Sequence, residues 1–141
     1  MVCFAPLLLV GYALTIETSW HQSYNADAPY VQLQTCEVGW GAHGKLSALP
    51  WGTAGLHYGF AWSPATDVEL IAQPQLGLSY VNQIHPNGYR QISRFEVGLA
   101  MLARYRQLQI SLEYTHLSNG EFGSRSNVGL DLIGLQTGWK F

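Results

Sequence analysis

The chain has 141 residues, of which 48% are hydrophobic and only 11% are charged, and its formal net charge is -2. This charged fraction is well below the roughly 25% of soluble domains, and without a basic excess the chain does not have the composition of a nucleic-acid binder. The mean hydropathy is +0.02, and the apolar residues alternate with polar ones instead of forming the runs of about 20 that transmembrane helices need.

The first segment along the chain is an apolar stretch at residues 7–10. No Lys or Arg precedes it, so residues 1–13 lack the charged start of a full secretory signal. Residues 10–20 are predicted to form a strand. Residues 30–40 are predicted to form a less regular one, with a bulge near Cys36.

Alternation of apolar and polar residues predicts β-strands in the rest of the chain. In residues 55–63, for example, Leu56 and Tyr58 share one face of the expected strand, and His57 lies on the other. Four more segments alternate in the same way: residues 68–82, 94–106, 108–118 and 131–141.

The connections between these strands alternate between short and long. Tight turns are expected at residues 63–67 and 106–107, and long loops rich in Gly, Pro, Asn and Ser at residues 41–52, 82–93 and 119–130. In bacterial outer-membrane barrels the short turns face the periplasm and the long loops face outside. The strand that ends at residue 118 is therefore expected to run outward.

These features predict an all-β fold, an antiparallel transmembrane β-barrel of the eight-stranded type, as one domain over residues 1–141 in the bacterial outer membrane. Seven strands are clear, and such barrels have an even number. The first strand is therefore expected to be missing, degenerate within residues 1–9, or encoded upstream of Met1. The alternative is a soluble sandwich or lipocalin-like barrel. The soluble alternative is disfavoured because aromatic residues cluster at the strand ends, where the interfacial belts of a membrane barrel lie. These residues are Tyr58, Trp62, Tyr80, Tyr105, Tyr114 and Trp139.

The last quarter of the chain carries the candidate chemistry. His116 and Ser118 are two residues apart and so share the apolar face of one strand. Asp131 has the parity of the apolar residues on the next strand. A base within reach of a serine can activate the hydroxyl, and a carboxylate can orient that base. Because polar groups on a lipid-facing wall are costly, their presence favours a catalytic role over an incidental one.

The segment from His116 through Asn119 to Asn127 and Asp131, followed by an alternating strand, resembles the lipid A 3-O-deacylase family, PagL. The resemblance implies an eight-stranded barrel with Ser118 as nucleophile and His116 as base. Asp131 stands where the family has a glutamate, whose side chain is one methylene longer than that of aspartate. The loop between Ser118 and Asp131 is one residue longer in this chain than in the family. Asn119 matches the oxyanion-hole residue, and Asn127 is expected to order the loop.

The expected function is a serine esterase that removes an ester-linked acyl chain, at the 3-position by resemblance, from the lipid A of lipopolysaccharide. Its expected partners are lipid A and outer-membrane lipid, with no nucleic acid and with a homodimer left open. No cofactor and no metal are expected. The alternatives are a structural or adhesive barrel without chemistry and a lipid A acyltransferase.

Other polar residues are expected to be structural. The remaining histidines form no metal-ligand spacing, and whether Cys3 and Cys36 pair is left open. An eight-stranded lumen is narrow enough to be filled by side chains. The inward parity predicts a polar filling that contains Arg94, Glu96, Arg104, Arg106 and Glu113.

Overall fold

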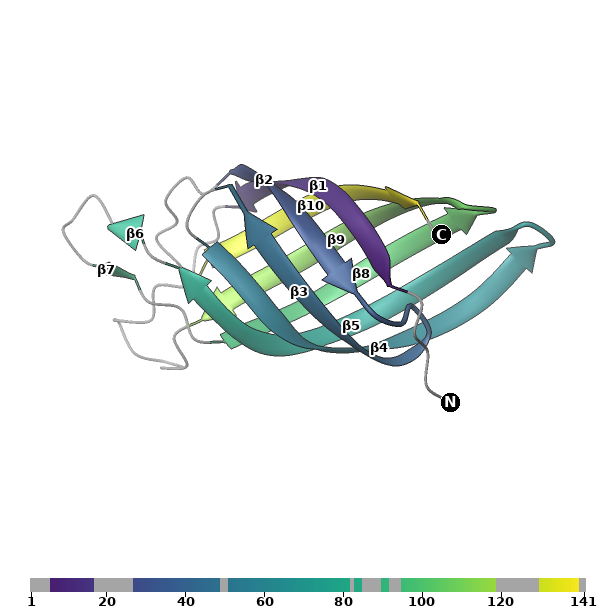
Figure 1. Cartoon of the computed structure of the whole chain (residues 1–141), viewed down its shortest axis with the longest axis horizontal. Coiled ribbons are helices and arrows are strands. Elements are labelled where there is room, and N and C mark those ends of the chain that lie inside the picture. The colour runs from purple at the N-terminus through teal and green to yellow at the C-terminus, as the bar shows by residue number, and fades with distance from the viewer. Residues whose placement is uncertain are drawn as a thin grey trace.

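A computed structural model of the chain shows one closed antiparallel barrel, in which the strands follow one another around the wall in chain order (Figure 1). It describes residues 6–16, 27–48, 51–81, 83–84, 90–91, 95–118 and 130–139. Among these residues no helix is long and apolar enough to cross a membrane. The barrel strands are β1 (Leu7–Ile16), β2 (Ala28–Gln34), β3 (Gly39–Ser47), β4 (Trp51–Ala65), β5 (Val68–Val81), β8 (Phe95–Tyr105), β9 (Leu108–Ser118) and β10 (Leu130–Trp139).

The predicted eight-stranded barrel is confirmed, but the strand count made from the sequence was wrong. All eight strands lie within the chain, and β1 closes the barrel by pairing with β10. The expectation of a missing or degenerate first strand is therefore overturned. The additional strand is β3, which covers residues that the sequence predicts to be the end of a bulged strand and the start of a long loop. Residues 35–38 form a turn between β2 and β3, and only residues 48–50 separate β3 from β4.

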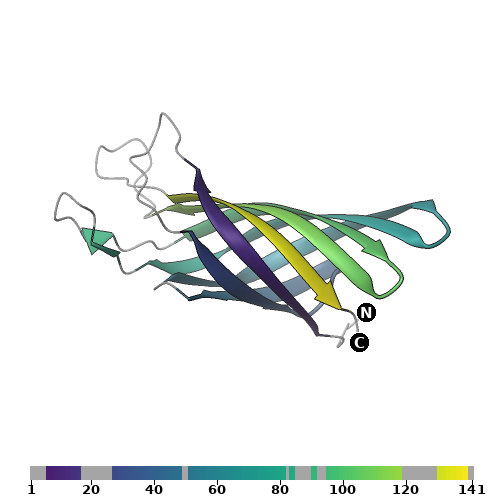
Figure 2. The ribbon, with the colours of Figure 1, turned by 90° about the horizontal axis from the view of Figure 1, so that it is seen from above.

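The two ends of the barrel differ. Residues 35–38, 66–67 and 106–107 connect strands at one end, where β1 also begins and β10 also finishes (Figure 2). We call this the inner end. Residues 17–27, 48–50, 82–94 and 119–129 connect strands at the opposite, outer end, and β6 (Gln83–Ile84) and β7 (Arg90–Gln91) form a small separate ladder within the third of these connections.

The two faces of the wall have opposite character, as the alternation predicts. Large apolar side chains face outward on every barrel strand and remain about half exposed, among them Leu14, Leu33, Leu46, Leu56, Leu76, Leu99, Leu112 and Leu135. A continuous apolar band of this kind is suited to hydrocarbon and not to water. At the inner end of the band, Trp40, Tyr58 and Phe60 form an aromatic group, with ring centroids 5.2 Å apart for the first pair and 4.7 Å apart for the second.

Buried charges fill the middle of the lumen. Lys45 of β3 forms ion pairs with Glu96 of β8 and, at 2.9 Å, with Glu113 of β9, and all three side chains are almost fully buried. His43 Nε2 lies 2.9 Å from the other oxygen of Glu96. These groups are separated from water, so each charge depends on its partners for stability.

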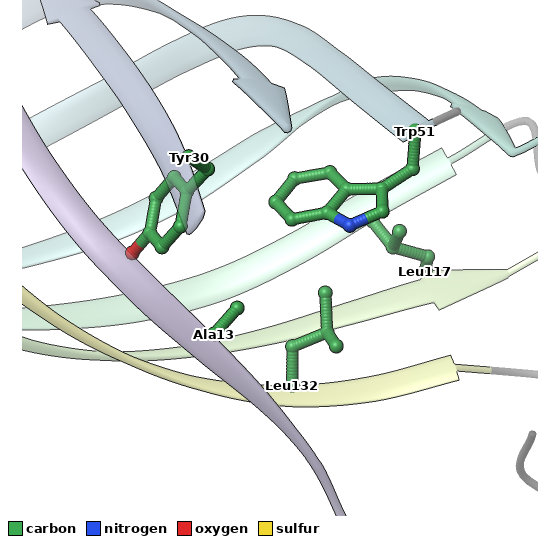
Figure 3. Packing of buried hydrophobic residues seen from close by; sticks show 5 residues of the cluster. All are labelled: Ala13, Tyr30, Trp51, Leu117 and Leu132. Atoms are coloured by element: carbon green, nitrogen blue, oxygen red, sulfur yellow. The ribbon is translucent and has the colours of Figure 1, made fainter. Parts of the chain in front are cut away.

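An apolar cluster closes the lumen nearer the outer end (Figure 3). Tyr30 and Trp51 lie with ring centroids 5.6 Å apart, and Leu117 of β9 and Leu132 of β10 pack with them and with Ala13. The outer part of the β9–β10 wall is therefore backed by packed side chains.

The turn at residues 35–38 fills the inner end of the lumen. Cys36 and Glu37 are buried there, and the carbonyl oxygen of Cys36 bonds His57 while that of Glu37 accepts a 2.7 Å hydrogen bond from Gln73. Arg104 pairs with both Glu37 and Glu69.

One arginine of the expected polar filling, Arg106, does not line the lumen. Arg106 lies in the β8–β9 turn with a φ of 55°, and its guanidinium is 5.2 Å from the Tyr105 ring centroid. It is exposed at the inner end instead of lining the lumen, because the tight turn interrupts the strand alternation there. Arg94 lies outside the described residues.

Gly59→Ala should destabilise the barrel by about 1 to 3 kcal/mol, the usual cost of overpacking. A methyl group at Gly59 would overlap the backbone carbonyl of Glu37, so the turn would have to shift. Gly44→Ala is the matched control, since its nearest neighbour would be 3.7 Å away. Urea unfolding in detergent micelles measures both. Equal midpoints for the two variants would contradict the close approach of the turn to β4.

Candidate functional site

The outward face at the outer end of β9 carries the predicted histidine and serine. His116 pairs across the wall with Val97 of β8, and Ser118 pairs with Phe95. Both side chains have the parity of the exposed Leu112 and not of the buried Glu113, which faces the lumen as predicted. Residues two apart on a strand are separated by about 6.5 Å, a distance that an imidazole and a hydroxyl can span together.

β10 places the predicted carboxylate beside that histidine. Asp131 lies directly opposite His116 in the antiparallel register, and its Oδ1 is 2.7 Å from His116 Nδ1. The carboxylate is on the outward parity of β10, but Asp131 is only 3% exposed. It can therefore form a charge-assisted hydrogen bond with little competition from water.

Tyr114 also contacts Asp131, which the sequence did not reveal. Its hydroxyl donates to Asp131 Oδ1 at 2.6 Å, so the Tyr114 and His116 side chains meet the same oxygen. The sequence alone predicts Tyr114 to be a residue of the membrane interface. The available signal was its position two residues before His116 on the same face, diagonally across from Asp131.

Ser118 is the last residue of β9 and is 2% exposed. Its neighbour Leu117 points to the other face and packs in the apolar cluster, as does Leu132 next to Asp131 (Figure 3). The two strands that carry the site are thus backed from within the lumen. Asn119 and Asn127, the residues expected to support the oxyanion and the loop, lie outside the described residues.

The contact between His116 and Asp131 determines what the imidazole can do. With Nδ1 as the donor to the carboxylate, Nε2 is the nitrogen that can take a proton from a hydroxyl and return it. The carboxylate would also stabilise an imidazolium formed by such a transfer. The arrangement therefore suits general-base chemistry on the outside of the wall.

The other described histidines belong to the lumen. His43 binds Glu96, and His57 binds the carbonyl of Cys36. Within the described ranges, no three His, Cys, Asp and Glu side chains are grouped so that they could hold a metal ion. His21 and His85 lie outside those ranges.

Comparison with solved structures supports the barrel fold. The fold is similar to the crystal structure of the outer membrane enzyme PagL, with a TM-score of 0.60 and 10% identity over 94% of this chain and 99% of that one. It is also similar to Neisserial surface protein A (NspA), with a TM-score of 0.59 and 14% identity over 98% of this chain and 97% of that one. At these identities the likeness concerns the fold.

Sequence comparison assigns the family. A search of curated protein sequences finds no significant match, but residues 9–140 match the family described as lipid A 3-O-deacylase (PagL). The match covers nearly the whole barrel and includes every strand that contributes to the site. The chain is an outer-membrane β-barrel, and it belongs to the lipid A 3-O-deacylase (PagL) family.

Proposed function

We propose that the protein is an outer-membrane serine esterase that removes an ester-linked acyl chain, the one at the 3-position, from the lipid A of lipopolysaccharide. The observation that carries this proposal is the 2.7 Å contact between His116 and Asp131 on the outward wall, on the same face as Ser118. Family membership supports the substrate class.

In the proposed reaction, Ser118 Oγ attacks the ester carbonyl and its proton passes to His116 Nε2. The bond between the carbonyl carbon and the sugar oxygen then breaks, and the sugar oxygen takes the proton from His116. This leaves an acyl chain on Ser118. Water, deprotonated by His116, then attacks that acyl group. The bond between the carbonyl carbon and Ser118 Oγ breaks as His116 returns the proton to Ser118 Oγ, and the acyl chain leaves as the free fatty acid.

Asp131 would orient the imidazole throughout this cycle, because it accepts from Nδ1 while Nε2 exchanges the proton. The backbone N–H of Asn119 is the proposed oxyanion donor, since this residue directly follows the nucleophile. Asn127 is proposed to order the loop. The reaction needs no metal and no cofactor.

The surroundings of the site suit a substrate that stays in the membrane. Val97, Leu99 and Leu112 face outward on β8 and β9 and are about half exposed. An acyl chain in the leaflet can pack along these side chains while its ester reaches the outer end of the wall. The substrate would therefore arrive by lateral diffusion, without entering the barrel.

Incubation of the purified protein with lipopolysaccharide in detergent micelles, followed by mass spectrometry of the lipid A, tests the proposal. We expect the loss of one hydroxyacyl chain, assigned to the 3-position by fragmentation of the product. Gain of an acyl chain would favour an acyltransferase instead. Unchanged lipid A would favour a structural barrel and would overturn the esterase proposal.

A further inference from the structure

Asp131 Oδ1 is the meeting point of two donors from one strand. Tyr114 Oη lies 2.6 Å from it and His116 Nδ1 lies 2.7 Å from it. Because the register places Asp131 opposite His116, and Ile133 opposite Tyr114, the tyrosine reaches the carboxylate diagonally along the wall. A long aromatic side chain spans that diagonal, whereas a short one does not.

The hydrogen bond from Tyr114 stabilises a carboxylate that is shielded from water. Asp131 must be ionised to hold the imidazole, yet it lies on an apolar wall and is 3% exposed, so water contributes little to its stabilisation. The Tyr114 hydroxyl supplies a hydrogen-bond donor to this carboxylate from the protein itself, without a water molecule. Two donors on one oxygen also restrict rotation of the carboxylate, because rotation would break both hydrogen bonds.

Tyr114 differs in this respect from an interfacial tyrosine. Tyrosines of a membrane interface direct the hydroxyl toward water and headgroups. The Tyr114 ring is on the lipid side and the residue is 43% exposed, but its hydroxyl points along the wall to a buried carboxylate. The Tyr114 ring is thus part of the outward apolar surface, while its hydroxyl is hydrogen-bonded to Asp131 within the candidate site.

We infer that Tyr114 is a positioning residue of the esterase, which holds Asp131 in the orientation that fixes the His116 imidazole. The inference rests on the proposed function and deepens it. Tyr114 acts through Asp131 and takes no part in proton transfer.

Tyr114→Phe removes the hydroxyl and keeps the ring. We expect kcat for lipopolysaccharide deacylation to fall about 10- to 100-fold, the range that one hydrogen bond to a charged group supports. KM should stay within about twofold, because the ring that faces the acyl chains is retained. Tyr105→Phe is the matched control, since Tyr105 also faces outward but lies at the inner end. An unchanged kcat in Tyr114→Phe, or an equal loss in Tyr105→Phe, would overturn the inference.

A double-mutant cycle separates positioning from a general structural effect. In the Asp131→Asn background, Tyr114→Phe should cause no further loss of kcat, because the group through which it acts is already altered. Losses that multiply would show that Tyr114 acts independently of Asp131 and would overturn the inference.

A measurement that does not depend on catalysis keeps this inference distinct from the esterase proposal. The His116 Nδ1–H proton resonance, recorded by NMR in detergent micelles, should move in Tyr114→Phe and stay in place in Tyr105→Phe. If the wild type fails to deacylate lipopolysaccharide but the resonance moves, only the esterase proposal fails. If the wild type is active and neither the resonance nor kcat changes, only the role of Tyr114 fails.

Discussion

Ser118→Ala is expected to lower lipopolysaccharide deacylation at least about a thousandfold while the barrel remains folded. Alanine removes the oxygen that forms the acyl intermediate in the proposed mechanism, and it leaves the His116–Asp131 contact in place. The deleted hydroxyl is small, and Ser118 lies at the very end of β9, so little packing is lost. Mass spectrometry of the lipid A measures the rate, and the change in gel mobility on heating reports folding.

Ser111→Ala is the matched control for this variant. Ser111 is on the same strand and equally buried, but it faces the lumen. Ser111→Ala should therefore leave the rate of lipopolysaccharide deacylation unchanged. Retained activity in Ser118→Ala would remove Ser118 from the mechanism, and equal losses in both variants would indicate a structural effect on β9.

The second large effect is expected from Lys45→Met, which should destabilise the barrel by about 3 to 5 kcal/mol. Lys45 pairs with Glu96 and Glu113, whose side chains are almost fully buried. Without the ammonium group, two carboxylates remain close together in the lumen with too little compensation. Urea unfolding in detergent micelles gives the difference in unfolding free energy.

Two further variants test the cause of that loss. Arg106→Gln also removes a cation, but from the exposed β8–β9 turn, and should change stability by less than about 0.5 kcal/mol. The triple variant Lys45→Met/Glu96→Gln/Glu113→Gln should regain much of the lost stability, because the uncompensated charges are gone. If the triple variant is no more stable than Lys45→Met, packing and not charge accounts for the effect.

The sequence predicts much of this fold because the two faces of the wall are chemically distinct. On β4, β5, β8, β9 and β10 the alternation alone identifies the strand and its outward face. It fails at β3, where three glycines weaken the pattern and the preceding turn points Cys36 and Glu37 into the lumen. The signal that marks this turn is Gly39, which has a φ of 75°, a value that favours glycine.

The candidate site is predictable to the extent that it depends on parity. Parity places His116, Ser118 and Asp131 on one face without knowledge of the register. The register decides that Asp131 lies opposite His116, and thus that the Tyr114 hydroxyl reaches the same carboxylate. Register depends on the length and path of the connection between β9 and β10, which local alternation does not encode.

The filled interior has a consequence for the cell envelope. A wide barrel would open an aqueous route for ions and small solutes, but here buried Lys45, His57 and Gln73, the apolar cluster and the turn at residues 35–38 occupy the space between the described strands. Purified protein in a planar bilayer should therefore give no stepwise current. A bacterium can carry many copies without weakening the permeability barrier that its surface lipids provide.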